Sequence, residues 1–199
     1  IGSDIRKEAP IIAHRIRKSA LNGSQVSFIN SEFSDYFFDV SSFVTGDILE
    51  SLCTLVRTLK IKLSNGAASI ESSIAKSDDS EVIAKSLSSE GDALILLGHE
   101  AINHPQSSTI RYLASLIAKA TNSKFGFVTE GANTIGACLT GITPHRGMNG
   151  AKRSKPGQNT DTIKECSSKL TLLWNSEPNA DIPNFADKKG NDASVIAFS

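Results

Sequence analysis

Three histidines occupy positions that could support chemistry. His99, His104 and His145 stand in loops that are expected to follow strands. Glu100 and Glu130 lie near them in the sequence. A histidine beside a carboxylate can transfer protons or contribute to a metal site. The spacing matches no metal-binding motif, however, and polar residues are common in surface loops. We therefore predict no catalytic, cofactor-binding or metal-binding residue in this chain.

Other familiar sources of chemistry are missing from the sequence. The three cysteines, Cys53, Cys138 and Cys166, are scattered and form no Cys-x-x-Cys pair. Such a set is typical of a reducing compartment and predicts neither a disulfide framework nor a zinc or iron–sulfur site. The sequence also lacks a nucleophile elbow, a Walker loop and a Gly-x-Gly-x-x-Gly fingerprint.

Charge and hydropathy exclude two further classes of partner. The chain has 21 Lys and Arg against 21 Asp and Glu, so its net charge is zero and indicates no general attraction to nucleic acid. The basic residues 152–155 lack interleaved aromatics, and we interpret them as a solvated loop. No apolar run is long enough to span a bilayer, so we predict no direct membrane insertion.

Alternating strands and helices must position the polar loops. Residues 25–30, 92–98 and 124–128 have the apolar runs of buried strands, and 92–98 leads into a loop at 99–105. Apolar residues at helical spacing predict helices at 48–63 and 106–121.

A further helix is predicted at 8–22, with Ile12, Ile16 and Ala20 as its buried stripe. Strands that alternate with helices favour parallel sheets with helical crossovers. The predicted fold class is therefore α/β, with two Rossmann-like lobes.

The polar, Ser-rich stretch in the middle of the chain suggests the division between the lobes. We predict a first lobe over residues 1–65, a connector over 66–91 and a second lobe over 92–199. Residues 1–10 and 174–183 form a weak internal repeat in which each copy leaves a strand. Two facing loops of this kind would suit a dinucleotide. Strands at both ends of the chain suggest a fragment of a longer protein.

A glycine-rich stretch over residues 129–147 follows the strand at 124–128. It contains the run Glu130-Gly131-Ala132-Asn133 and ends on Pro144-His145-Arg146-Gly147. Glycine allows positive φ and close approach of the backbone, so the stretch is either tightly packed or faces a ligand.

These residues resemble a known family. The opening run from Ile1 to Pro10, the helix that contains His14 to Lys18, and Gly23 before a strand resemble the molybdopterin oxidoreductase fold. The Leu96-Leu97-Gly98 run with His104-Pro105 narrows the resemblance further. The segment from Glu130 to Gly147 is the most specific part, and it resembles the large iron–sulfur subunit of respiratory NADH:quinone oxidoreductase (complex I). The similarity is spread over most of the chain.

The resemblance implies a fragment from the C-terminal, molybdopterin-oxidoreductase-like region of that subunit. The [4Fe-4S] and [2Fe-2S] clusters are then expected in a missing N-terminal part, and the partners would be other subunits of the peripheral arm. The expected location is the cytoplasmic side of the inner membrane, or the matrix side in mitochondria. Electrons would pass from NADH through those clusters to quinone, coupled to proton translocation.

Two departures from molybdenum-containing relatives bear on the cofactor. Where those relatives have Asp-Pro-Arg after the second strand, this chain has Asn30-Ser31-Glu32, and their Pro-Gly-Thr-Asp run is here Val44-Thr45-Gly46-Asp47. The departures favour a non-catalytic scaffold that has lost its pterin. The alternative is the cofactor-cleft portion of a molybdopterin-dependent oxidoreductase, and an unrelated nucleotide-binding domain is a third interpretation.

Overall fold

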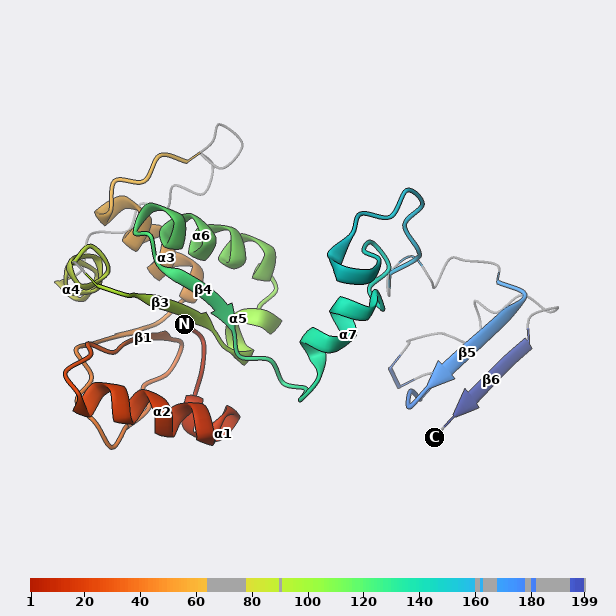
Figure 1. The fold of residues 1–199 in the computed structure, drawn as a ribbon, viewed down its shortest axis with the longest axis horizontal. Coiled ribbons are helices and arrows are strands. Elements are labelled where there is room, and N and C mark those ends of the chain that lie inside the picture. The colour runs from red at the N-terminus through yellow and green to blue at the C-terminus, as the bar shows by residue number, and fades with distance from the viewer. Residues whose placement is uncertain are drawn as a thin grey trace. The chain divides into compact units, whose positions relative to one another are not determined.

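The computed structural model describes residues 1–63, 78–89, 91–159, 162, 168–177, 180–181 and 194–198. The contacts divide the chain into two compact units, Ile1–Ala132 and Asn133–Ser199 (Figure 1). The boundary predicted at 66–91 lies within the first unit, because residues on both sides of it contribute to the same core. Residues 66–77 and 90 of that predicted connector lie outside the described residues.

Two parallel strand pairs organise the first unit. β1 (Ser27–Asn30) pairs with β2 (Ser42–Thr45), and Phe28 is level with Phe43. β3 (Leu94–Leu97) pairs with β4 (Lys124–Phe127) in the same manner. The prediction of a mixed α/β chain with parallel pairing is thus confirmed for these strands.

The first residues of the chain lie between the two pairs. The Ile1 nitrogen donates to the Leu96 carbonyl at 2.9 Å, and the Gly98 N–H donates to the Ile1 carbonyl at 2.8 Å. On the other side, the Gly2 N–H donates to the Ile29 carbonyl at 2.7 Å. The spatial order is therefore β2, β1, the N-terminal segment, β3 and β4.

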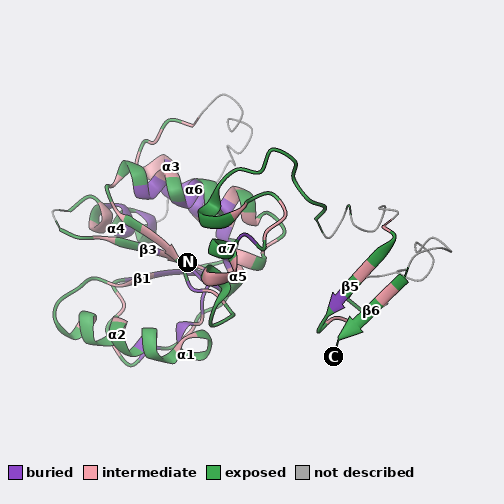
Figure 2. Cartoon of the chain, turned by 45° about the vertical axis from the view of Figure 1, so that its right-hand side comes forward, coloured by how far each residue is buried: buried purple, intermediate pink, exposed green. Residues whose placement is uncertain are grey.

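Alternate residues of the strands enter two different cores, as expected for strands that are covered on both faces. Ile29, Ile95 and Leu97 belong to one core, whereas Phe28 and Leu96 contact the other. Helices α3 (Ile48–Thr58), α4 (Asp78–Leu87) and α6 (Ser107–Ala120) supply the first core. α1 (Ile5–Glu8) and α2 (Pro10–Leu21) cover the opposite face (Figures 1 and 2).

The helices follow their sequence signals with one correction. α3 begins where the Asp47 carboxylate accepts the Glu50 N–H at 2.8 Å, an N-cap that satisfies a free helix donor. In α2 the predicted stripe was wrong in part: Ala13 is the buried residue, and Ile12 is exposed. Ala13 belongs to the core that contains Phe28 and Tyr36, and Ile16 of the predicted stripe packs against that core.

The stretch predicted as a loop at 99–105 contains a short helix, α5 (His99–Asn103). Its first residues approach the N-terminal segment closely, since a Cβ on Gly98 would lie 2.6 Å from the Gly2 carbonyl oxygen. Only glycine fits this contact without movement of the backbone.

The second unit contains α7 (Thr134–Thr140), a short 3₁₀ helix η2 (Met148–Gly150) and the parallel pair β5 (Leu170–Trp174) and β6 (Ser194–Phe198). Figure 2 shows that most of this pair is exposed. Residues 178–179 and 182–183 of the second repeat copy lie outside the described residues.

Within the described ranges, no helix combines the length and the apolar composition needed to cross a membrane.

Candidate functional site

A cleft of about 260 Å³ lies in the first unit, where β3 and β4 end. Glu8, His99, Val128, Thr129 and Glu130 line it. In a parallel sheet this edge is the usual location of a ligand site, because the loops that leave neighbouring strands meet there. The sequence had placed His99 and Glu130 in such loops, and the structure brings them together.

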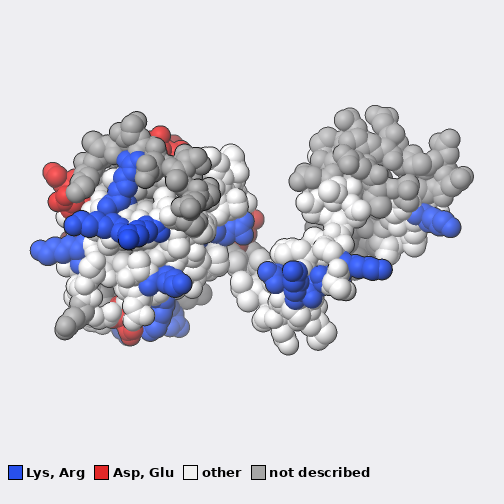
Figure 3. All heavy atoms as spheres, turned by 90° about the horizontal axis from the view of Figure 1, so that it is seen from above, with Lys and Arg blue, Asp and Glu red and all other residues white. Residues whose placement is uncertain are grey.

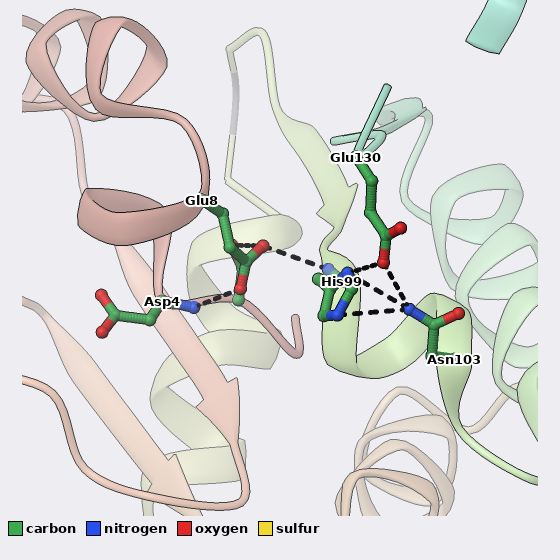
Figure 4. A network of polar contacts seen from close by, with 6 residues as sticks. Asp4, Glu8, His99, Asn103 and Glu130 are labelled. Atoms are coloured by element: carbon green, nitrogen blue, oxygen red, sulfur yellow. Dashed lines mark hydrogen bonds and ion pairs between the residues drawn. The ribbon is translucent and has the colours of Figure 1, made fainter. Parts of the chain in front are cut away.

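The Glu8 carboxylate bridges the N-terminal segment and α5. One oxygen accepts the Ser3 hydroxyl at 2.8 Å and the His99 backbone N–H at 3.1 Å, and the other accepts the Asp4 N–H at 2.8 Å. Figure 4 shows this carboxylate between Asp4 and His99. A negative charge at the start of a helix is favourable, because the free N–H groups carry partial positive charge.

A second group of contacts surrounds the His99 ring. Glu130 forms an ion pair with its Nδ1, and the Asn103 amide donates to the Glu130 carboxylate at 2.9 Å (Figure 4). The side chains of His99 and Glu130 are 50% and 59% exposed. Water therefore screens the pair, and such exposed pairs contribute little to stability. The cluster connects α5 to the segment that follows β4.

Asn30, the last residue of β1, forms hydrogen bonds with the N-terminal segment. The Asn30 side chain accepts the Ser3 N–H at 3.0 Å and donates to the Ser3 carbonyl at 3.0 Å. Asn30 is buried, so both of these hydrogen bonds satisfy groups that would otherwise be costly to bury. The neighbouring Ser31 N–H points to the Glu100 carboxylate at 3.4 Å.

This edge does not fit a pterin dinucleotide. The cofactor is an anion, whereas Glu8 and Glu130 line the cleft with carboxylates. Glu8 also accepts the backbone N–H of His99, and N–H groups at helix N-termini are the donors that commonly bind phosphate. The chain's own groups thus satisfy donors that an anionic ligand would need, and we derive no chemical step through such a cofactor.

The remaining histidines named in the sequence lie elsewhere. The His104 ring accepts the Gln106 N–H at 3.1 Å, a local contact at the start of α6. His145 is exposed and belongs to the second unit. Across the described part of the chain, no three His, Cys, Asp or Glu side chains gather in a way that could hold a metal ion.

Sequence reasoning missed Glu8 and Asn103. Glu8 belongs to the predicted first helix, 91 residues from the His99 N–H that it accepts. Asn103 was noted only as part of a loop, and its approach to Glu130 depends on the helical turn that aligns it with His99. An acid at the start of a helix was the one available signal for Glu8.

Most of the glycine-rich stretch is exposed, and its close packing is confined to a turn in the second unit. Gly141 ends α7 with φ of 83°, and a Cβ there would lie 2.7 Å from the Gly147 carbonyl carbon. Arg153 fixes the same turn by donating to the Gly141 carbonyl at 2.7 Å and to the Arg146 carbonyl at 2.8 Å. Figure 3 shows Lys and Arg side chains on this unit. Arg153 at least has a structural role.

Comparison of the chain with family models, curated proteins and solved structures gives no match.

Proposed function

We propose that this chain is part of the large iron–sulfur subunit of an NADH:quinone oxidoreductase, where it acts as a non-catalytic scaffold that has lost its molybdopterin cofactor. The observation that carries the scaffold role is the Glu8 carboxylate, which accepts three donors at the edge where an anionic cofactor would bind. The resemblance of the Glu130–Gly147 segment carries the family.

The arrangement of the first unit supports this proposal. The order β2, β1, N-terminal segment, β3, β4 is that of five strands in a doubly wound sheet with its first strand at the centre. We infer a Rossmann-like lobe for this unit and a related lobe for the second. The parallel pairing of β5 with β6 is compatible with that inference.

The scaffold role also follows from charge. A guanine or a pyrophosphate needs donors and positive charge, which relatives provide with an arginine after the second strand. Here that position is Glu32, and the neighbouring Ser31 N–H faces Glu100. In the proposed assembly, electron transfer from NADH to quinone belongs to the clusters of other regions, and this chain supports neighbouring subunits of the peripheral arm at the membrane surface.

The proposal is tested by isolating the full-length protein with an affinity tag from membranes of its natural source. We expect it to migrate in native gels with NADH dehydrogenase activity and to co-purify with the other peripheral-arm subunits, which mass spectrometry identifies. An untagged strain is the control. Migration apart from that activity, or with the partners of a different oxidoreductase, would overturn the family assignment.

Deletion of the region within the full-length subunit tests the scaffold role separately. We expect the deletion to reduce the amount of assembled complex, because neighbouring subunits lose their support. A complex that assembles to the normal level and retains full activity would contradict that role.

A further inference from the structure

A second pocket lies in the first unit, at the connection between β1 and β2, and it shares no lining residue with the strand-end cleft. It has a volume of about 400 Å³, and Phe33, Asp35, Tyr36, Phe38, Asp39 and Phe43 are among the residues that line it. Most of them come from the connection between the two strands. Nothing in the proposed function uses this pocket.

Aromatic rings form a continuous wall around it. The ring centroids of Phe33 and Phe43 are 4.9 Å apart, and those of Tyr36 and Phe38 are 5.4 Å apart. Phe28 stacks beneath Tyr36 at 4.2 Å with the two planes 6° apart, so the wall is anchored in the core. Phe33 is 69% exposed, an unusual position for a large apolar ring.

Both charged residues that line the pocket, Asp35 and Asp39, are acidic. Residues 19–56 contain five acids, among them Asp35 and Asp39, and no lysine or arginine. Within the described ranges, neither aspartate has an ion-pair partner. Burial raises the pKa of the Tyr36 hydroxyl, and that ring is therefore neutral at physiological pH.

Two arginines of the same chain already contact this loop, and one of them, Arg17, donates its Nε–H to the Phe37 carbonyl at 3.1 Å. The Arg6 guanidinium lies 4.4 Å from the centroid of the Phe37 ring and donates to the Asp35 carbonyl at 2.7 Å. Arg6 thus contacts the ring of Phe37, which does not line the pocket, and a backbone carbonyl. The aspartate side chains and the rings that line the pocket therefore remain available to another cation.

We propose that this aromatic pocket receives the guanidinium of an arginine that a partner protein presents. A planar guanidinium stacks on aromatic faces and pairs with carboxylates, and both kinds of group are present here. An anionic group that entered the pocket would be repelled by Asp35 and Asp39, which line it. The inference does not depend on the family proposed above.

The test is an NMR titration of the ¹⁵N-labelled 199-residue chain with the peptide acetyl-Gly-Arg-Gly-amide. We expect saturable shifts confined to residues 33–43, with a dissociation constant on the order of 10 mM for a single cation on an exposed aromatic site. The matched peptide with citrulline, which has nearly the same shape but no charge, is expected to bind about threefold to tenfold more weakly.

Two variants locate the binding. Phe33→Ala, and the double variant Asp35→Asn with Asp39→Asn, should each weaken binding of the arginine peptide about threefold or more. These side chains are exposed, so the variants should keep the fold, which the unchanged remainder of the spectrum checks. Glu32→Gln removes an acid that does not line the pocket and is expected to leave binding nearly unchanged.

Three results would overturn the proposal. The first is equal binding of the arginine and citrulline peptides to the unsubstituted chain. The second is shifts centred on the Glu8 and Glu130 cleft instead of residues 33–43. The third is saturable binding of inorganic phosphate at the pocket. Each of these is measured on the unsubstituted chain, so none depends on a variant that folds poorly.

Discussion

At the scale of single residues, Glu8 satisfies hydrogen-bond donors at the strand-end cleft that a ligand would otherwise need. Its carboxylate collects the Ser3 hydroxyl and two backbone N–H groups at distances of 2.8–3.1 Å. A carboxylate that accepts several donors orders the groups around it. The N-terminal segment and the start of α5 are therefore fixed by the same side chain.

Replacement of this carboxylate tests that role. We expect Glu8→Gln to lower the free energy of unfolding by about 1–2 kcal/mol, because the amide carries no charge and retains only one acceptor oxygen. Urea denaturation followed by far-UV circular dichroism reports on it, since most of the described helical residues belong to the first unit.

Glu32→Gln is the matched control, because Glu32 has no hydrogen bond or ion pair in the described ranges. It should move the midpoint little. An equal effect of the two substitutions would show that the contacts of Glu8 are not responsible.

The cysteines provide a second residue-scale prediction. Cys53 is 6% exposed in α3, and burial raises the pKa of its thiol, whereas Cys138 is exposed in α7. Alkylation requires an accessible thiolate. We expect iodoacetamide to label Cys138 in the native chain and Cys53 only after urea is added, as peptide-resolved mass spectrometry would show. Comparable native labelling of both would contradict the packing of α3. Cys166 lies outside the described residues.

At the scale of elements, the N-terminal segment connects the two strand pairs into one layer. Its hydrogen bonds reach Ile29 on one side and both Leu96 and Gly98 on the other. The layer depends on close approach at Gly98, where a side chain would meet Ser3 and the Gly2 carbonyl oxygen.

Gly98→Ala is therefore expected to destabilise the first unit by about 1–3 kcal/mol, the usual cost of overpacking a tight contact. Gly126→Ala is the control, because the added methyl would meet only the flexible end of Leu96 at 3.2 Å. We expect a lower urea midpoint for Gly98→Ala than for Gly126→Ala. Similar midpoints would mean that the segment adjusts freely and does not hold the layer together.

The sequence predicted the elements better than their contacts. The apolar runs at 94–97 and the helical spacing in α6 made both elements evident. The short helix α5 could not be expected, because four or five residues carry too little periodicity and its start depends on Glu8, far away in the chain. The buried face of α2 depends on the aromatic residues packed against it, which periodicity within the helix does not contain.

For the candidate site, the sequence placed His99 and Glu130 at strand ends but could not predict their ion pair. The ion pair forms because β3 and β4 are adjacent and parallel, which places the residues that follow each strand close together. The sequence also could not predict that the Glu8 carboxylate accepts the His99 N–H, because the two residues lie 91 positions apart.

At the scale of the whole molecule, the two units pose different questions. The first has helices on both faces of its strands and two cores, whereas β5 and β6 of the second keep Leu172 and Trp174 exposed at 61% and 79%. A two-stranded pair alone is marginally stable in water. An assembly in which other chains surround the second unit accords with the scaffold role that we propose.

The molybdenum and pterin content of the full-length protein, purified from its natural source, tests directly whether the chain has lost its molybdopterin cofactor. Mass spectrometry of the metals and fluorescence of the oxidised pterin would measure both on one sample. We expect iron from the clusters of the neighbouring region, molybdenum far below one atom per chain, and no pterin. One molybdenum atom and one pterin dinucleotide per chain would contradict this expectation and favour the molybdopterin-dependent oxidoreductase.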